Sequence, residues 1–298
     1  MIVKLGLHLG YASTRFYEPE IWTKIVREQF NINYVQFTSN LLDPIYPNKI
    51  LDEQIKKIKF YTKKYNIIIE DTFTSPRLNY LGHSNKLIRN YWFKWLKKFF
   101  LISKKLGARS SGSLLGIMSF SDLNKNFKET EENIIKGWVE LSKYAKKIGL
   151  EFLIWEPMSI KREMGDTVNY TLDLHKKLNR QSGVPILLNL DVDHGNSHSG
   201  FKGDSNPYYW IEKLSKYSPC IHIKQKTKDV HGHKPFTKYY NKNGIIHPKK
   251  ILKSLKKGGC KETTLYFEFS FREREPFDSK SIKDITESVK YWREYVKL

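Results

Sequence analysis

Short apolar segments alternate along the chain with longer segments in which apolar side chains recur every three to four residues. The short segments are rich in β-branched residues and lack polar alternation, which is typical of strands buried on both faces of a parallel sheet. The longer segments have the period of amphipathic helices. The pattern predicts strands at residues 2–9, 34–38, 67–73, 108–113, 150–156, 185–191, 219–222 and 263–268. It predicts helices at residues 18–30, 49–65, 85–106, 129–148, 166–178, 207–216, 248–257 and 280–296.

This order of elements predicts one fold. Eight strand-then-helix units in 298 residues are typical of a (β/α)8 barrel, the TIM barrel. Glycines follow several lysine-rich helix ends, as at Gly107 and Gly149, where they suit the left-handed turn that ends a helix. No linker rich in proline, glycine or serine interrupts the chain, so we expect residues 1–298 to form a single domain.

Four of the predicted strands, all in the second half of the chain, end on a metal-type ligand. The segments LEFLIWE, PILLNLD and PCIH end on Glu156, Asp191 and His222, and TTLYFE ends on Glu268. Each side chain alone has an ordinary explanation, such as a carboxylate paired with a lysine or a histidine satisfied in the core. In a parallel barrel, however, the carboxyl ends of the strands meet at one face. Three carboxylates and an imidazole there form a mostly oxygen ligand set for a divalent cation.

Other polar residues lie close to these strand ends. His194 lies three residues after the second of the four ligands, where it could reach the same site or a substrate. Lys224 lies two residues after the third ligand and would face the same way in a strand. The longest irregular stretch, residues 224–243, also contains Gln225 and His233. Long loops on the catalytic face of a barrel commonly carry substrate contacts, so we expect this stretch to contribute them.

Composition limits the setting in which the protein acts. No apolar run approaches the roughly 18 residues of a membrane span, and the first ten residues have the pattern of a strand and not of a signal peptide. Only Cys220 and Cys260 are present, which indicates a reducing compartment without a disulfide framework, so we expect a cytoplasmic enzyme. The formal net charge of +21 comes mostly from lysines spread over helix faces. We interpret it first as solvated surface and second as attraction for an anionic substrate.

The segments WEPM, LDVDHGN, IHIKQ and FEFSFRERE, together with the barrel plan, resemble the xylose-isomerase-like superfamily of sugar isomerases and epimerases. Within that superfamily the chain is most similar to the ketose 3-epimerases and to the tetrulose-phosphate epimerases and racemases. GLHLGYASTRFYEPE near the start and HKPFTKYYN in the late loop also resemble the tetrulose-phosphate group. The resemblance covers nearly the whole chain, and it is more specific for the superfamily than for one sugar.

The resemblance implies a role for each matching position. Ligands of a divalent metal are implied at Glu156, Asp191, His222 and Glu268. Manganese is the first expectation for such a site, with magnesium or cobalt as alternatives. Glu156 and Glu268 are also implied as the two acid/base carboxylates, and His194 is implied as a contact of the substrate oxygens.

One departure from the family pattern concerns the substrate. Ketose 3-epimerases usually carry a second glutamate six residues after the first ligand, but here Arg162 stands at that position, with Glu163 beside it. The planar guanidinium of Arg162 suits a phosphate better than a neutral hydroxyl group, which favours a phosphorylated ketose over a free one. Further candidates for contacts with the substrate are Lys224, Gln225 and His233, together with Arg15, His231 and Lys234.

The implied site predicts proton transfer next to a carbonyl group. A metal bound to the carbonyl and the neighbouring hydroxyl oxygen would stabilise the enediolate that forms when the proton leaves. Removal of the proton by one carboxylate and its return by the other would invert the centre, which is epimerisation or racemisation. Return to the adjacent carbon would instead give aldose–ketose isomerisation, and the sequence leaves both reactions open. The predicted partner is a small sugar or sugar phosphate.

Two alternatives belong to the same superfamily. A metal-dependent endonuclease acting at abasic DNA sites would use the positive charge, and Asp229 and His231 resemble its Asp-x-His pair. Such enzymes hold three zinc ions, however, and the third and fourth predicted strands lead into DTFTSP and SSGS without the extra histidines. We therefore expect no nucleic acid as a partner. A cyclic-ketose dehydratase stays open, as does assembly into a homodimer or homotetramer.

Overall fold

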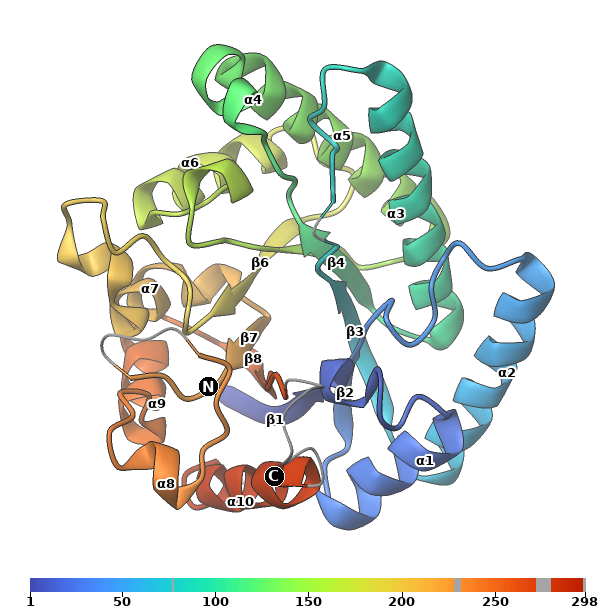
Figure 1. Cartoon of the computed structure of the whole chain (residues 1–298), viewed down its shortest axis with the longest axis vertical. Coiled ribbons are helices and arrows are strands. Elements are labelled where there is room, and N and C mark those ends of the chain that lie inside the picture. The colour runs from blue at the N-terminus through green and yellow to red at the C-terminus, as the bar shows by residue number, and fades with distance from the viewer. Residues whose placement is uncertain (77, 228–231, 272–279, 297–298) are drawn as a thin grey trace.

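The computed structural model describes residues 1–76, 78–227, 232–271 and 280–296. Eight parallel strands close into a barrel in the order of the sequence, and helices surround them (Figure 1). The strands are β1 Ile2–His8, β2 Tyr34–Phe37, β3 Ile68–Thr74, β4 Ser110–Leu114, β5 Phe152–Glu156, β6 Ile186–Asp191, β7 Cys220–Ile223 and β8 Glu262–Phe267. The predicted (β/α)8 barrel is therefore confirmed.

The main helices follow the strands as the sequence pattern predicts. They are α1 Pro19–Lys24, α2 Asn48–Lys64, α3 Lys86–Leu106, α5 Phe127–Ile148, α6 Val168–Asn179, α7 Pro207–Leu214, α9 Pro248–Lys257 and α10 Ser281–Arg293. The helix expected at residues 18–30 is divided, because α1 continues into a π-helical stretch at Ile25–Gln29. In the described part of the chain, no helix has the length and apolar composition that crossing a membrane requires.

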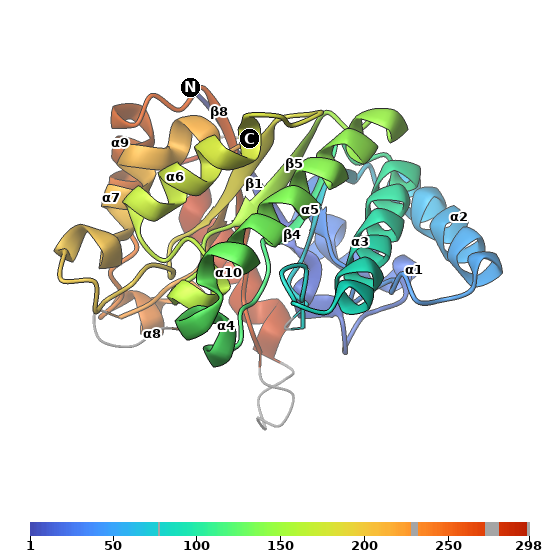
Figure 2. The ribbon, with the colours of Figure 1, turned by 90° about the horizontal axis from the view of Figure 1, so that it is seen from above.

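Two short helices were not predicted. They are α4 Phe120–Lys125, which follows β4, and α8 Lys238–Asn241, which lies inside the stretch expected to be irregular. Figure 2 shows both at the end of the barrel opposite the N-terminus, which is the end where the strands finish. Each begins with a side-chain cap, from Ser119 and Thr237 respectively, so local hydrogen bonding stabilises a turn that has no strong apolar period.

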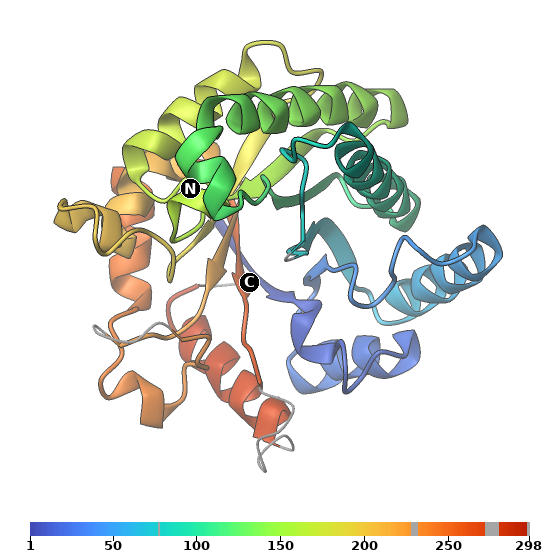
Figure 3. The ribbon, with the colours of Figure 1, turned by 45° about the horizontal axis from the view of Figure 1, so that its top comes forward.

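The core has two layers. Figure 3 shows the ring of helices around the strands. Large apolar side chains from the strands and these helices fill the outer layer, including the fully buried Trp22, Trp138 and Trp292. Inside the barrel a smaller apolar cluster fills the space between the strands. Its members are Phe73, Leu114, Phe152, Ile154, Met158, Cys220 and Tyr266. The barrel interior is therefore a packed core, which holds the strand ends in fixed positions.

Gly112 marks a point of very close contact inside this core. It pairs with Ile154 across β4 and β5, and a Cβ atom at Gly112 would lie 2.0 Å from the backbone oxygen of Ile154. Such an overlap can be relieved only if the two strands move apart, which a packed barrel resists.

We therefore expect Gly112→Ala to lower the free energy of unfolding by several kcal/mol, or to prevent folding. Gly137, inside α5, is a matched control, because a Cβ atom there would meet only the Leu81 side chain at 3.5 Å. Gly137→Ala should be neutral or stabilise the protein by up to about 1 kcal/mol. Urea unfolding measures both changes, and equal effects at the two positions would contradict the close contact at Gly112.

Candidate metal centre

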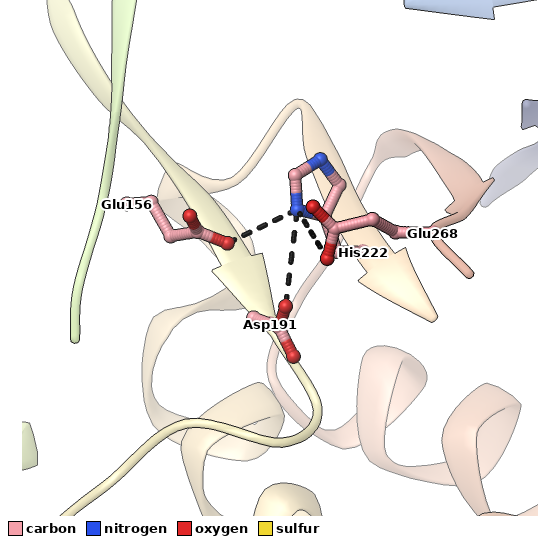
Figure 4. A group of neighbouring side chains, drawn as sticks. All are labelled: Glu156, Asp191, His222 and Glu268. Atoms are coloured by element: carbon pink, nitrogen blue, oxygen red, sulfur yellow. Dashed lines mark hydrogen bonds and ion pairs between the residues drawn. The ribbon is translucent and has the colours of Figure 1, made fainter. Parts of the chain in front are cut away.

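The four predicted ligands lie together at the carboxyl ends of β5 to β8 (Figure 4). Glu156 and Asp191 are the last residues of β5 and β6. His222 is opposite Asp191 in the register of β7 against β6, and Glu268 directly follows β8. One ligand atom from each residue lies within 4.8 Å of the other three. Closure of the barrel therefore brings together side chains that are up to 112 residues apart, counting from 156 to 268.

The Nδ1 atom of His222 faces all three carboxylates. It lies 3.0 Å from Glu156 Oε1, 3.5 Å from Glu268 Oε2 and 3.8 Å from Asp191 Oδ2. Burial alone would lower the pKa of His222, but the negative charges of Glu268 and Glu156 outweigh burial and raise this pKa to about 9. The three carboxylates make the space around Nδ1 attractive to positive charge.

Lys224 adds a buried ammonium group to the cluster. Its side chain is completely buried and forms ion pairs with Asp191 and Glu268. Burial opposes ionisation of all three groups, but their mutual attraction prevails. The pKa of Lys224 is raised by the two carboxylates, whereas the pKa of Asp191 is lowered by Lys224 and that of Glu268 is lowered by His222 and Lys224.

The geometry and the charge of this cluster fit a divalent cation. Oxygen and nitrogen ligands sit about 2.1 Å from such an ion, so ligand atoms on opposite sides are about 4.2 Å apart, close to the observed spread. The buried Asp191 Oδ2 atom forms an ion pair with Lys224. Among the described residues, no hydrogen bond of normal geometry reaches this atom. Three carboxylates and one ammonium group leave two negative charges when the imidazole is neutral, which a divalent ion would balance.

Two of the predicted substrate contacts border the cluster. His194 Nδ1 lies 3.8 Å from Glu156 Oε1 and 3.0 Å from the backbone oxygen of Pro157. His233 Nδ1 lies 3.0 Å from Lys224 Nζ and 3.5 Å from Glu268 Oε2, and its side chain is 41% exposed. Both imidazoles therefore lie at the edge of the centre, where a bound substrate would meet them.

Gln225 lies in the same loop but its side chain serves the loop itself. Its amide nitrogen donates to Asn241 Oδ1 at 2.9 Å and to the Ile246 oxygen at 3.1 Å. Its amide oxygen accepts from the backbone nitrogens of Lys226 and Ile246, at 3.1 Å and 2.9 Å. These bonds use the full hydrogen-bonding capacity of the amide, so the predicted substrate contact of Gln225 would require one of them to break.

Arg162 lies over the loop that follows β4. Its guanidinium donates to the Met118 oxygen at 3.3 Å, lies 5.6 Å from the ring centre of Phe120 and is 3.9 Å from the Glu163 carboxylate. None of the contacts known for the described residues joins it to the four ligands. Its predicted role as a substrate contact therefore stays a prediction.

The remaining candidates are spread over the rim. Arg15 donates to the Phe271 oxygen at 2.9 Å, and the Lys234 ammonium lies 5.6 Å from the ring centre of Tyr240. Asp229 and His231 lie outside the described residues.

The sequence analysis missed residues beside the cluster, among them His8, Gln36 and Asn189. His8 is the last residue of β1, its ring centre lies 5.3 Å from that of His222, and burial lowers its pKa to about 4. The strand ends in the first half of the chain were not searched for ligand-type residues, and such a search would have found His8. Gln36 Oε1 lies 2.6 Å from His222 Nε2, but Gln36 is in the middle of β2, where no sequence signal marks it.

We expect Lys224→Met to lower the free energy of unfolding, measured with a metal chelator present, by about 3–5 kcal/mol, because two buried carboxylates lose their cation. Lys105→Met is the matched control, since Lys105 pairs with Asp52 on the exposed surface and should have little effect. Urea unfolding at pH 7 compares the two variants. If Lys224→Met lowers the free energy of unfolding by no more than Lys105→Met does, then Lys224 does not balance the charge of the two carboxylates.

Comparison with known proteins places the chain among sugar epimerases. No protein-family model matches it. The D-erythrulose 1-phosphate 3-epimerase of Brucella abortus is 32% identical over 301 residues, which cover 99% of this chain and 97% of that protein. The solved structure of a candidate xylose isomerase from Rhodospirillum rubrum has a TM-score of 0.89 at 23% identity, covering 98% of this chain and 99% of that one.

More distant structures share the fold. D-psicose 3-epimerase from Clostridium cellulolyticum has a TM-score of 0.67 at 16% identity, covering 98% of this chain and 91% of that one. L-ribulose 3-epimerase has a TM-score of 0.69 at 16% identity, covering 99% of this chain and 93% of that one. Because the Brucella enzyme matches along its full length, the chain belongs to the xylose-isomerase-like family of TIM-barrel sugar epimerases that includes that enzyme.

Proposed function

We propose that the protein is a divalent-metal-dependent epimerase of a short ketose phosphate. The observation that supports this most strongly is the buried cluster of three carboxylates and an imidazole, which has two negative charges in excess of its ammonium group. Its full-length relative is a D-erythrulose 1-phosphate 3-epimerase, so a tetrulose phosphate is the first substrate to test. We propose Mn²⁺ as the metal, with Mg²⁺ or Co²⁺ as alternatives, since carboxylates and imidazole accept all three.

The positions of Glu156 and Glu268 support a scheme in which protons are transferred from two sides. Figure 4 shows Glu156 and Glu268 approaching His222 Nδ1 from different directions. A bound divalent cation would supply the positive charge that makes a proton next to a carbonyl group easier to remove. One glutamate would take that proton and the other would return one to the opposite face of the same carbon, which inverts it. His194 would hold a substrate oxygen during both steps.

The phosphate end of the substrate needs cations that lie outside the cluster. His233 borders the centre and is partly exposed, and Arg162 carries the planar donor fork that binds phosphate in two places. Lys224, which is held between two carboxylates, would contact an oxygen close to the reacting carbon instead. The net charge of +21 would draw an anionic substrate towards the protein.

The alternative functions receive less support. A three-zinc nuclease needs more ligands than the four that lie together among the described residues, and β3 and β4 end on Thr74 and Leu114. The relatives described above are epimerases or a candidate isomerase, which favours neither a nuclease nor a cyclic-ketose dehydratase. A cytoplasmic location and a homodimer or homotetramer remain our predictions.

The reaction can be tested through exchange of the substrate proton with solvent. We expect the protein to catalyse incorporation of deuterium next to the carbonyl of D-erythrulose 1-phosphate in deuterated water, because the proposed route removes that proton. NMR follows the exchange with Mn²⁺, Mg²⁺ or Co²⁺ added, and with chelator as the control. No metal-dependent exchange with any tetrulose or pentulose phosphate would overturn the proposal, and cleavage of abasic DNA that chelator abolishes would favour the nuclease.

The two-glutamate scheme predicts that Glu156→Gln and Glu268→Gln each lower kcat by about 10²–10⁴-fold, because each removes one proton-transfer group. Glu151→Gln makes the same exchange at an exposed position and should leave kcat unchanged. Metal content is measured for each variant, so that loss of metal can be separated from loss of proton transfer. Near-normal kcat in either site variant would show that the scheme is wrong.

A further inference from the structure

The imidazole of His222 has a second side that faces away from the proposed metal. While Nδ1 faces the carboxylates, Nε2 lies 2.6 Å from Gln36 Oε1 in the interior of the barrel. Both residues are completely buried. A buried imidazole can offer a lone pair at one nitrogen only if the proton is held at the other, so the partner of Nε2 decides which nitrogen is available to a metal.

The orientation of the Gln36 amide follows from its other neighbour. Gln36 Nε2 lies 2.8 Å from Asp71 Oδ1, and Tyr266 donates its hydroxyl hydrogen to Asp71 Oδ2 at 2.9 Å. Burial raises the pKa of Asp71 to about 7, so above that pH Asp71 is a carboxylate that only accepts hydrogen bonds, and the amide turns its NH₂ group towards it. The amide oxygen then faces His222, and it can only accept.

Further hydrogen bonds lie beyond Asp71, towards the amino end of the barrel. Asp71 lies beside Glu70, whose Oε2 accepts from Thr264 at 2.5 Å and whose Oε1 accepts from Lys4 at 2.7 Å. The Tyr266 hydroxyl group lies 3.4 Å from Glu70 Oε2 but 2.9 Å from Asp71 Oδ2, so its shorter hydrogen bond goes to Asp71. The hydrogen bonds from Gln36 and Tyr266 oppose the effect of burial and favour the carboxylate form of Asp71, which keeps the Gln36 amide in one orientation.

Apart from the three carboxylates around Nδ1, the other neighbours of the ring do not distinguish its two nitrogens. The amide nitrogen of Asn189 lies 3.1 Å from His222 Nε2 and 3.3 Å from Nδ1, so it is almost equally close to both. The sulfur of Cys220 is 4.0 Å from Gln36 Nε2 and is at most a weak acceptor. Gln36 is therefore the residue in this part of the barrel that selects one nitrogen.

We propose that Gln36, oriented by Asp71, is a positioning residue that keeps the proton of His222 on Nε2 and the lone pair of Nδ1 directed at the metal. This inference rests on the proposed metal site, but it concerns metal binding and does not depend on the identity of the sugar. Partners of this kind commonly change metal affinity by 10–100-fold when they are removed.

The test compares three variants without substrate. Gln36→Met keeps the side-chain length but removes the acceptor, so we expect the Kd for Mn²⁺, measured by titration calorimetry, to rise by about 10–100-fold. Gln36→Glu retains an acceptor oxygen for Nε2 and should recover affinity relative to Gln36→Met. Thr72→Val is the matched control, because it removes buried hydrogen bonds to Ser103 and Ser111 on the outer side of β3; its Kd should change less than twofold.

A second measurement separates positioning from folding. Urea unfolding in chelator should show similar losses for Gln36→Met and Thr72→Val, although only the first loses metal affinity. In the Mg²⁺-loaded wild-type protein, ¹H–¹⁵N correlation spectra should place the His222 proton on Nε2. A proton on Nδ1, or an unchanged Kd in Gln36→Met, would overturn the inference alone. Failure of the wild-type protein to bind any divalent metal would overturn the proposed metal site as well.

Discussion

The concentration of negative charge at the carboxyl ends of β5 to β8 is the constraint on which the rest of this structure depends. Buried carboxylates cost several kcal/mol each unless positive charge or hydrogen bonds compensate them. Lys224 supplies one buried positive charge, so two of the three negative charges remain unbalanced when the imidazole is neutral. The fold holds these groups together only because the strands that carry them are closed into a rigid ring.

The interior of the barrel supports the charged residues at the carboxyl ends of β5 to β8. An apolar cluster around Phe73 and Ile154 fills the space between the strands. Through it runs a chain of polar groups from the amino ends of the strands, where Lys4 pairs with Glu70, to the imidazole of His222. Each member has a partner, so the chain avoids the cost of unsatisfied polar groups and holds the metal-facing imidazole in place.

The candidate site combines residues fixed by the barrel strands with residues outside the strands. The four ligand-type residues belong to strands or directly follow them, where packing fixes their positions. The groups that would meet the far end of a substrate lie between the main elements, His233 on a loop and Arg162 in the short 3-10 helix Lys161–Glu163. In a TIM barrel such segments can vary while the residues at the strand ends keep their positions.

The amino-acid sequence by itself determined the barrel and the strand ends that carry Glu156, Asp191, His222 and Glu268, because periodicity and strand-end position are local properties. Only the tertiary structure decided the partners of these residues. The contact between Gln36 and His222 joins positions 186 residues apart, and no local pattern marks a glutamine in the middle of a strand. The same holds for Gln225, whose amide is used by its own loop, and for Lys224, which pairs with carboxylates from two other strands. Such pairings depend on how the strands meet across the barrel, which becomes defined only when the barrel closes.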